Sequence, residues 1–85
     1  MSERRAELAP VVEAAQRVAG LLAARGRGDR DGAAALMAGF ADDRELAGGA
    51  LLVAELCLGQ LGAERGEEVG ESVRRLCVDM EAALG

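Results

Sequence analysis

The sequence predicts an all-α fold, a small four-helix bundle, and three observations support this. Residues 46–63 (LAGGALLVAELCLGQLGA) carry a single charge, Glu55, whereas the segments around them are rich in Arg, Glu and Asp. Apolar residues elsewhere recur at spacings of three and four, which is the period of an α-helix. The chain has one Phe and no Trp, Tyr or Ile, so residues that favour strands are scarce apart from seven valines.

The first helix is expected over about residues 10–25. Proline is favoured in the first turn of a helix, where its missing amide hydrogen costs nothing, so Pro10 marks the start. Gly26 is expected to supply the left-handed residue that ends the helix. Residues 1–8 are polar and are expected to fray. The face that the helix buries is made of small and medium apolar residues: Leu8, Val11, Val12, Ala15, Val18, Ala19 and Leu22.

The second helix is predicted over about residues 32–40, after the charged turn GRGDRD. Asp29 or Asp31 is positioned to cap it, because a carboxylate before the first turn accepts a bond from an exposed amide. The helix should bury Ala33, Leu36, Met37 and Phe40. Phe40 is the only aromatic residue, and we expect it to fill the core.

The third helix, over about residues 43–63, is the most apolar segment. Asp42 followed by Glu45 predicts a capping box at its start. In helical projection, Leu51 with Leu58 and Leu52 with Leu56 flank the central apolar stripe on its two sides. A helix covered by apolar side chains on several sides needs several neighbours. The candidate interface residues are therefore Leu51, Leu52, Leu56 and Leu58.

The fourth helix, over about residues 67–84, is the clearest amphipathic element. Its apolar stripe consists of Val69, Val73, Leu76, Cys77, Met80 and Leu84. We expect this stripe to pack antiparallel on the third helix, because that helix is next in sequence and needs cover. The alternative is that the stripe docks on a partner. Both interpretations hold if the third and fourth helices together form a dimer interface.

Length and composition favour one domain, residues 1–85, that associates with a copy of itself. A chain of 85 residues has a small core, and side chains that are mostly Ala, Leu and Val remove little area from water. A homodimer, or a complex with another protein partner, would bury more apolar surface. The net charge of −5 argues against nucleic-acid binding, which requires a basic face. Ten Arg with no Lys are typical of a GC-rich bacterial genome.

The sequence indicates neither a metal site nor a membrane span. The two cysteines, Cys57 and Cys77, lie on apolar faces and are expected to be buried and reduced, and zinc would need about four Cys or His ligands where no His exists. The apolar run 46–54 is short of the ~20 residues that cross a bilayer. MSERRAELAP has no apolar stretch typical of a signal peptide, so we expect a cytoplasmic protein.

Catalytic residue types are scarce. The chain has no His, Lys or Tyr, and its hydroxyl residues are Ser2 and Ser72. Glu55 is the one candidate acid or base, if burial raises its pKa. Size and acidity resemble the acyl carrier proteins, but the Asp-Ser-Leu motif that carries their prosthetic group is absent, and Ser72 lies in Gly-Glu-Ser-Val instead. No cofactor is therefore expected.

These observations predict a non-enzymatic helical interaction or adaptor module that forms a homodimer. The alternative is a small apolar-ligand-binding protein with a pocket between helices, lined by Phe40, Met37, and Leu and Cys residues. An enzyme that uses Glu55 is the third and weakest hypothesis.

Overall fold

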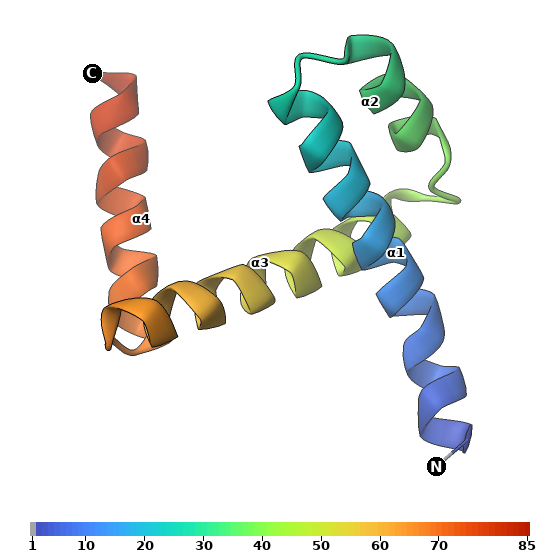
Figure 1. The fold of residues 1–85 in the computed structure, drawn as a ribbon, viewed down its shortest axis with the longest axis horizontal. Coiled ribbons are helices and arrows are strands. Elements are labelled where there is room, and N and C mark those ends of the chain that lie inside the picture. Colours follow the sequence, from blue (N-terminus) through green and yellow to red (C-terminus); the bar gives the residue numbers. More distant parts are fainter. Residues whose placement is uncertain (1) are drawn as a thin grey trace. The chain divides into compact units, whose positions relative to one another are not determined.

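A computed structural model of the chain describes residues 2–85, with side chains from Glu3 onward, and Met1 lies outside the described residues. This part of the chain contains four helices and no strand (Figure 1). The helices are α1 (Ser2–Gly26), α2 (Arg30–Ala38), α3 (Asp43–Arg65) and α4 (Val69–Leu84). The predicted all-α class with four helices is confirmed. The chain forms two compact units, Met1–Val53 and Ala54–Gly85, and the boundary falls inside α3.

The first helix is longer than predicted at its N-terminal end. Pro10 lies inside α1 and not in its first turn. Proline cannot donate a backbone hydrogen bond to the carbonyl four residues earlier, so the helix continues without that bond. Residues 3–8 (ERRAEL) include Arg, Glu, Ala and Leu, all strong helix formers. They are helical and exposed, and whether they fray stays a prediction.

Two glycines end the long helices in the left-handed conformation. Gly28 has a φ of 73° and closes α1, where the Asp29 amide donates to the Ala24 carbonyl at 2.9 Å. Gly66 has a φ of 66°, and the Glu67 amide donates to the Gly62 carbonyl at 2.9 Å. A left-handed glycine followed by such a hydrogen bond is a Schellman motif, and both helix ends have one. The left-handed residue after α1 is thus Gly28, whereas the sequence favoured Gly26.

Two aspartates cap the helices that follow the loops. Asp29 accepts a hydrogen bond from the Gly32 amide at 2.9 Å, which selects it over Asp31 as the cap of α2. Asp42 accepts from the Glu45 amide at 2.8 Å at the start of α3, as the predicted capping box requires. The carboxylate of Glu45 pairs instead with the Arg17 guanidinium, 3.7 Å away. Of the two hydrogen bonds of the capping box, the one from the Glu45 amide to Asp42 is therefore present, and the carboxylate of Glu45 is used elsewhere.

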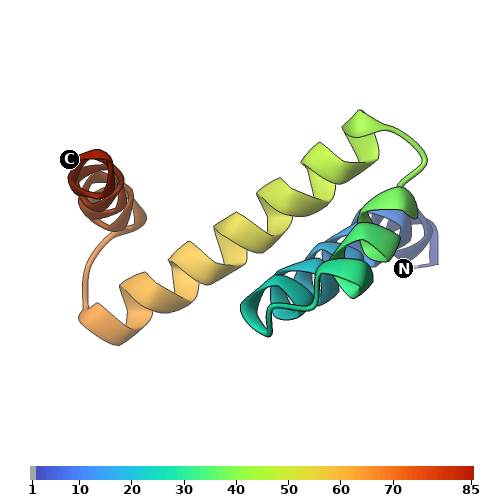
Figure 2. The same cartoon turned by 90° about the horizontal axis from the view of Figure 1, so that it is seen from above.

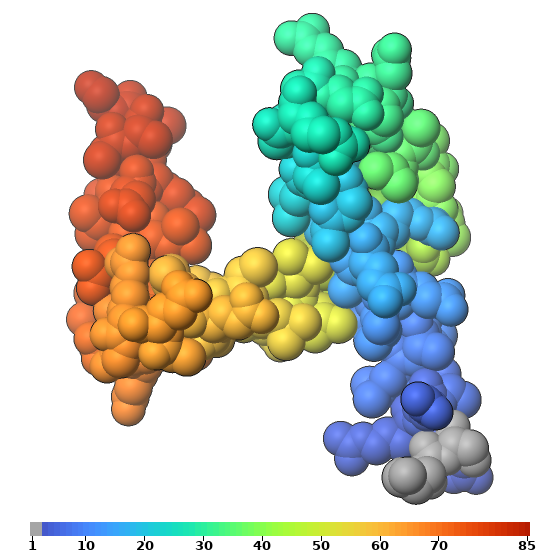
Figure 3. Space-filling model, viewed as in Figure 1, coloured from blue at the N-terminus to red at the C-terminus, as the bar shows by residue number. Residues whose placement is uncertain are grey.

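The buried apolar side chains of the described residues all belong to α1 and are Ala14, Ala15, Val18, Leu21 and Ala24. Helix α2 packs along α1, as Figures 2 and 3 show. The start of α3 approaches α1 at Gly49, where a Cβ atom would lie 2.7 Å from the Ala14 carbonyl carbon and oxygen. Phe40 is only half-buried and Met37 is exposed. The prediction that both are core residues is therefore wrong.

The second unit contains the end of α3 and α4, joined by a three-residue turn. Within residues 54–85 the only buried residues are Gly62 and Ser72, and neither has an apolar side chain. The described part of this unit therefore lacks a hydrophobic core. The predicted packing of the α4 stripe on α3 is not observed. The contact between these helices lies at the turn, where a Cβ atom on Gly62 would be 2.8 Å from the Glu67 carbonyl oxygen.

Candidate interaction surface

Helix α4 presents a continuous exposed row of apolar side chains, here called the α4 stripe. Its members are exposed by between 39% and 91% and are Val69, Val73, Leu76, Met80 and Leu84. Successive members are three or four residues apart, so they lie on one face of the helix. Cys77 borders the stripe and is also exposed. The amphipathic helix that the sequence predicted is therefore present, but its apolar face is open to solvent.

A polar network secures the start of α4 on one flank of the stripe. The Glu67 carboxylate accepts a hydrogen bond from the Ser72 hydroxyl at 2.8 Å and from the Arg75 guanidinium at 2.7 Å. These two bonds, the serine first, hold the pKa of Glu67 below its ordinary value of 4.5. Sequence reasoning missed this network, because Glu67 precedes the helix and its partners fall outside the three- and four-residue spacings.

The four candidate interface leucines occupy two faces of α3. Leu51 and Leu58 are seven residues apart and Leu52 and Leu56 are four apart, so each pair shares a face. Leu51 and Leu56 are exposed, while Leu52 and Leu58 are half-buried. Leu51 and Leu52 belong to the first unit and the other two to the second. Each unit thus has one of these leucines open to solvent.

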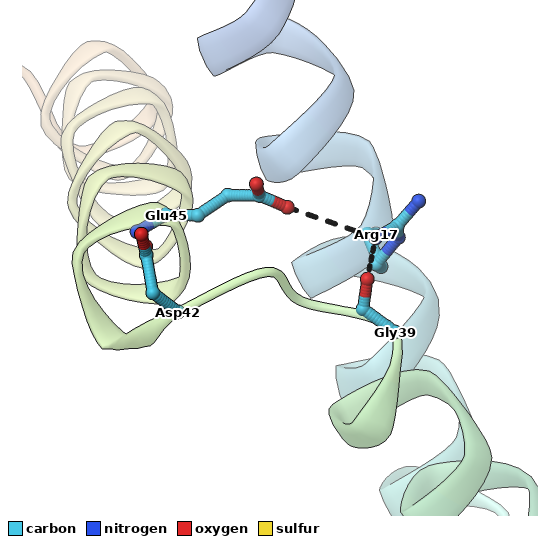
Figure 4. A network of polar contacts seen from close by, with 4 residues as sticks. All are labelled: Arg17, Gly39, Asp42 and Glu45. Atoms are coloured by element: carbon cyan, nitrogen blue, oxygen red, sulfur yellow. Dashed lines mark hydrogen bonds and ion pairs between the residues drawn. The ribbon is translucent and has the colours of Figure 1, made fainter.

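Arg17 forms the densest polar cluster of the first unit (Figure 4). Its guanidinium donates to the Gly39 carbonyl, pairs with Glu45, and lies 5.6 Å from the centre of the Phe40 ring. These contacts join α1 to the loop between α2 and α3. Phe40 thus lies half-buried beside the arginine, where its ring can interact with the guanidinium, and it does not enter the core.

The predicted ligand pocket is only partly present. An open groove of about 490 Å³ lies between α1 and α2, and Met37 and Leu21 line it together with the charged residues Arg25, Asp29 and Arg30. Phe40, Cys57 and Cys77 are not among its lining residues. The groove is open to solvent and three of its lining residues are charged, whereas sites for small apolar ligands are mostly enclosed and apolar.

The chemistry-bearing residues that the sequence singled out do not come together. Cys57 and Cys77 are both exposed, so the expectation that the thiols are buried is wrong. The cause is that the second unit has no apolar layer to cover them. Glu55 is exposed as well, so burial does not act on its carboxylate. No cluster of three or more His, Cys, Asp or Glu suited to a metal ion occurs within residues 2–85.

Helix α3 also meets the length and composition of a membrane-spanning segment. An 18-residue window within Asp43–Arg65 has a mean hydropathy of 1.6, and 11% of that window is buried. A single helix of this length and composition does not by itself establish a span. Glu55 lies near the middle of the helix, where insertion into a bilayer costs about 2.5–3.5 kcal/mol.

No known protein family, curated protein or solved structure matches the chain.

Proposed function

We propose that the protein is a small, non-enzymatic interaction module that associates with a second copy of itself. The observation that carries this proposal is a contrast within residues 3–85. Their small apolar core comes from α1 alone, whereas apolar residues of α3 and α4 are exposed. Single exposed leucines are ordinary on protein surfaces. A row of five exposed apolar side chains on one face of one helix, as in the α4 stripe, is typical of an interaction site.

The composition of the surface supports a protein partner over a nucleic acid. The net charge of −5 would repel phosphate groups, which dominate nucleic-acid affinity. Stripes of this kind, flanked by charged residues, are typical of helices that pack against other helices. We extend the proposal to a reduced, cytoplasmic setting, in which exposed thiols such as Cys57 and Cys77 remain free.

Sedimentation equilibrium and thermal melting over a concentration series test the proposal. A dimer that contributes to stability shows twice the monomer mass and a melting temperature that rises with concentration. If the protein sediments as a monomer at tens of micromolar (about the range in which weak dimers assemble) and melts independently of concentration, the proposal is wrong.

A matched pair of variants locates the interface on α4. Leu76→Arg places a charge in the α4 stripe, whereas Val78→Arg places the same charge on the opposite face of the same helix. Both wild-type side chains are exposed, so both variants should fold. Leu76→Arg should abolish association, because an unpaired charge cannot be accommodated in an apolar contact. Val78→Arg should associate as the wild type does.

A third variant tests the contribution of the predicted leucines. Leu56→Arg should weaken association if this face of α3 shares the interface with α4. Ala54→Arg is its control, because Ala54 is exposed and, two residues from Leu56, lies on the opposite face of the helix. If Leu56→Arg has no effect, the interface is confined to α4.

A further inference from the structure

We infer that the second copy binds through α4 itself, with the two α4 helices antiparallel and related by a two-fold axis between Leu76 and Cys77. The inference rests on the proposed self-association and specifies its geometry. Helix α4 spans Val69–Leu84, so its midpoint falls between these two residues. A two-fold interface uses the same patch on both copies, which must therefore complement itself.

The apolar residues of α4 satisfy this condition. Reversing the helix about its midpoint places Val69 opposite Leu84, Val73 opposite Met80, and Leu76 opposite Cys77 of the second copy. Each pair joins two apolar or weakly polar side chains, and every member is exposed. The spacing of four and three along Val69, Val73, Leu76 and Met80 is that of a two-helix seam.

The charged residues on the flanks of the stripe favour the antiparallel direction. Arg74, Cys77 and Glu81 follow one another at spacings of three and four on one flank. When two helices pack antiparallel across a perpendicular two-fold axis, equivalent flanks face each other. Arg74 then lies about 3 Å along the axis from Glu81 of the second copy, two residues at 1.5 Å each. Because the two-fold axis relates the two copies, this Arg74–Glu81 pair occurs twice in the dimer.

The parallel arrangement brings like charges together. The other flank of α4 carries Ser72 and Asp79, which are seven residues apart. In a parallel pair, opposite flanks face each other, so Glu81 would lie about 3 Å along the axis from Asp79 of the second copy. Like-charge neighbours are destabilising. The Glu67 network also occupies the Ser72 flank and leaves the Arg74 flank open to a partner.

A lipid surface fits α4 less well. Its charged residues are Glu71, Arg74, Arg75, Asp79 and Glu81, which sum to a net charge of −1 (two positive, three negative). Helices that lie on anionic membranes carry Lys and Arg on the polar face. The apolar stripe with mixed charges on its flanks is therefore better matched to a second α4.

Charge reversal tests the arrangement in the full chain. Arg74→Glu places Glu opposite Glu, and Glu81→Arg places Arg opposite Arg, so each variant should weaken the dimer by about tenfold, since two attractive pairs become two repulsive ones. The double variant Arg74→Glu/Glu81→Arg restores opposite charges and should recover wild-type association. Residues 74 and 81 are too far apart within one helix to pair with each other, so recovery reports contact between copies.

Ala82→Arg is the matched control, because Ala82 is exposed and lies on the face opposite the stripe. It should associate as the wild type does. Sedimentation equilibrium measures the dissociation constants, and circular dichroism checks that each variant is helical. With Cys57 replaced by Ser, a short bifunctional thiol reagent should also link Cys77 to Cys77 of the second copy, because the two thiols share one flank near the axis.

The outcomes separate this inference from the proposed function. Loss in both single variants with recovery in the double variant supports the antiparallel pair. If the wild type dimerises but the single variants dimerise equally well, or the double variant does not recover, the α4 pairing is wrong while self-association stands. A wild type that stays monomeric overturns both. Monomers that bind vesicles of phosphatidylcholine and phosphatidylglycerol would instead assign the α4 stripe to a lipid surface.

Discussion

The two units of the chain contain similar apolar residues, but these residues form a buried core in the first unit and stay exposed or half-buried in the second. In Met1–Val53, one face of α1, made of Ala14, Ala15, Val18, Leu21 and Ala24, is buried where α2 and the start of α3 pack on it. In Ala54–Gly85, Val, Leu and Met residues are just as frequent on the helix faces, yet none of the described ones is buried. Composition alone therefore does not decide whether an apolar face becomes core or surface.

The difference lies in what lets helices approach. In the first unit, Gly49 of α3 meets the backbone of α1 at Ala14 with no side chain between them, and Arg17 holds the α2–α3 loop against α1. The second unit has only two helical segments joined by a short turn, and Glu67 bonds to Ser72 and Arg75 of α4 alone. A core needs at least two faces in contact, so the second unit is the one that benefits from a partner.

The largest contrast is expected when a charge is introduced into each unit. Val18 is 5% exposed in the α1 core, and Val18→Asp should lower the free energy of unfolding by at least about 3 kcal/mol, because a buried unpaired carboxylate loses its hydration. Val73→Asp places the same charge on exposed α4, where surface substitutions change stability by roughly 0.5 kcal/mol or less. Urea denaturation of dilute protein, followed by circular dichroism, measures both.

Equal losses for the two valine variants would contradict the contrast. They would mean that the α4 stripe is covered within a single chain, and Val73 would then have to be treated as a core residue.

A smaller contrast is expected between two glycines of α3, one in each unit. A Cβ atom on Gly49 would lie 2.7 Å from the Ala14 backbone, whereas one on Gly59 would meet nothing within 4 Å. Gly49→Ala should therefore destabilise the protein by about 1–3 kcal/mol through overpacking. Gly59→Ala should stabilise it by about 0.5–1 kcal/mol, because alanine favours the helix. If Gly49→Ala is stabilising, α1 and α3 do not approach closely in solution.

The local features of the fold could be predicted from sequence to a large extent. The apolar periodicity identified four helices, and the caps at Asp29 and Asp42 follow from short-range hydrogen bonding that neighbouring residues determine. Pro10 misled the prediction of the first helix, because seven good helix formers before it continue the helix despite the missing bond. At Pro10, several weak preferences thus outweighed one strong signal.

Long-range features were harder to predict. The periodicity of α4 shows that it has an apolar face but not what covers it, so packing on α3 was predicted and exposure was found. The positions of Phe40 and of both cysteines were missed for the same reason. Whether a side chain is buried depends on which helices meet, and helical periodicity does not contain that information.

The smallest effect is expected from the pH dependence of Glu67. Hydrogen bonds from Ser72 and Arg75 lower its pKa in the folded protein, whereas the unfolded chain has the ordinary value of 4.5. The network therefore stabilises the fold fully above pH 4.5, and this contribution is lost as the pH falls through the lower folded value. Glu67→Gln removes the titrating group, so its stability deficit relative to wild type should shrink on acidification.

Ser72→Ala should raise the pKa of Glu67, as a carboxyl-detected NMR titration would show, since the serine bond is the largest cause of the shift. A Glu67 that titrates at the ordinary value in wild type would mean that the start of α4 is not held by this network, and the flank of the stripe assigned to Ser72 would be open to a partner as well.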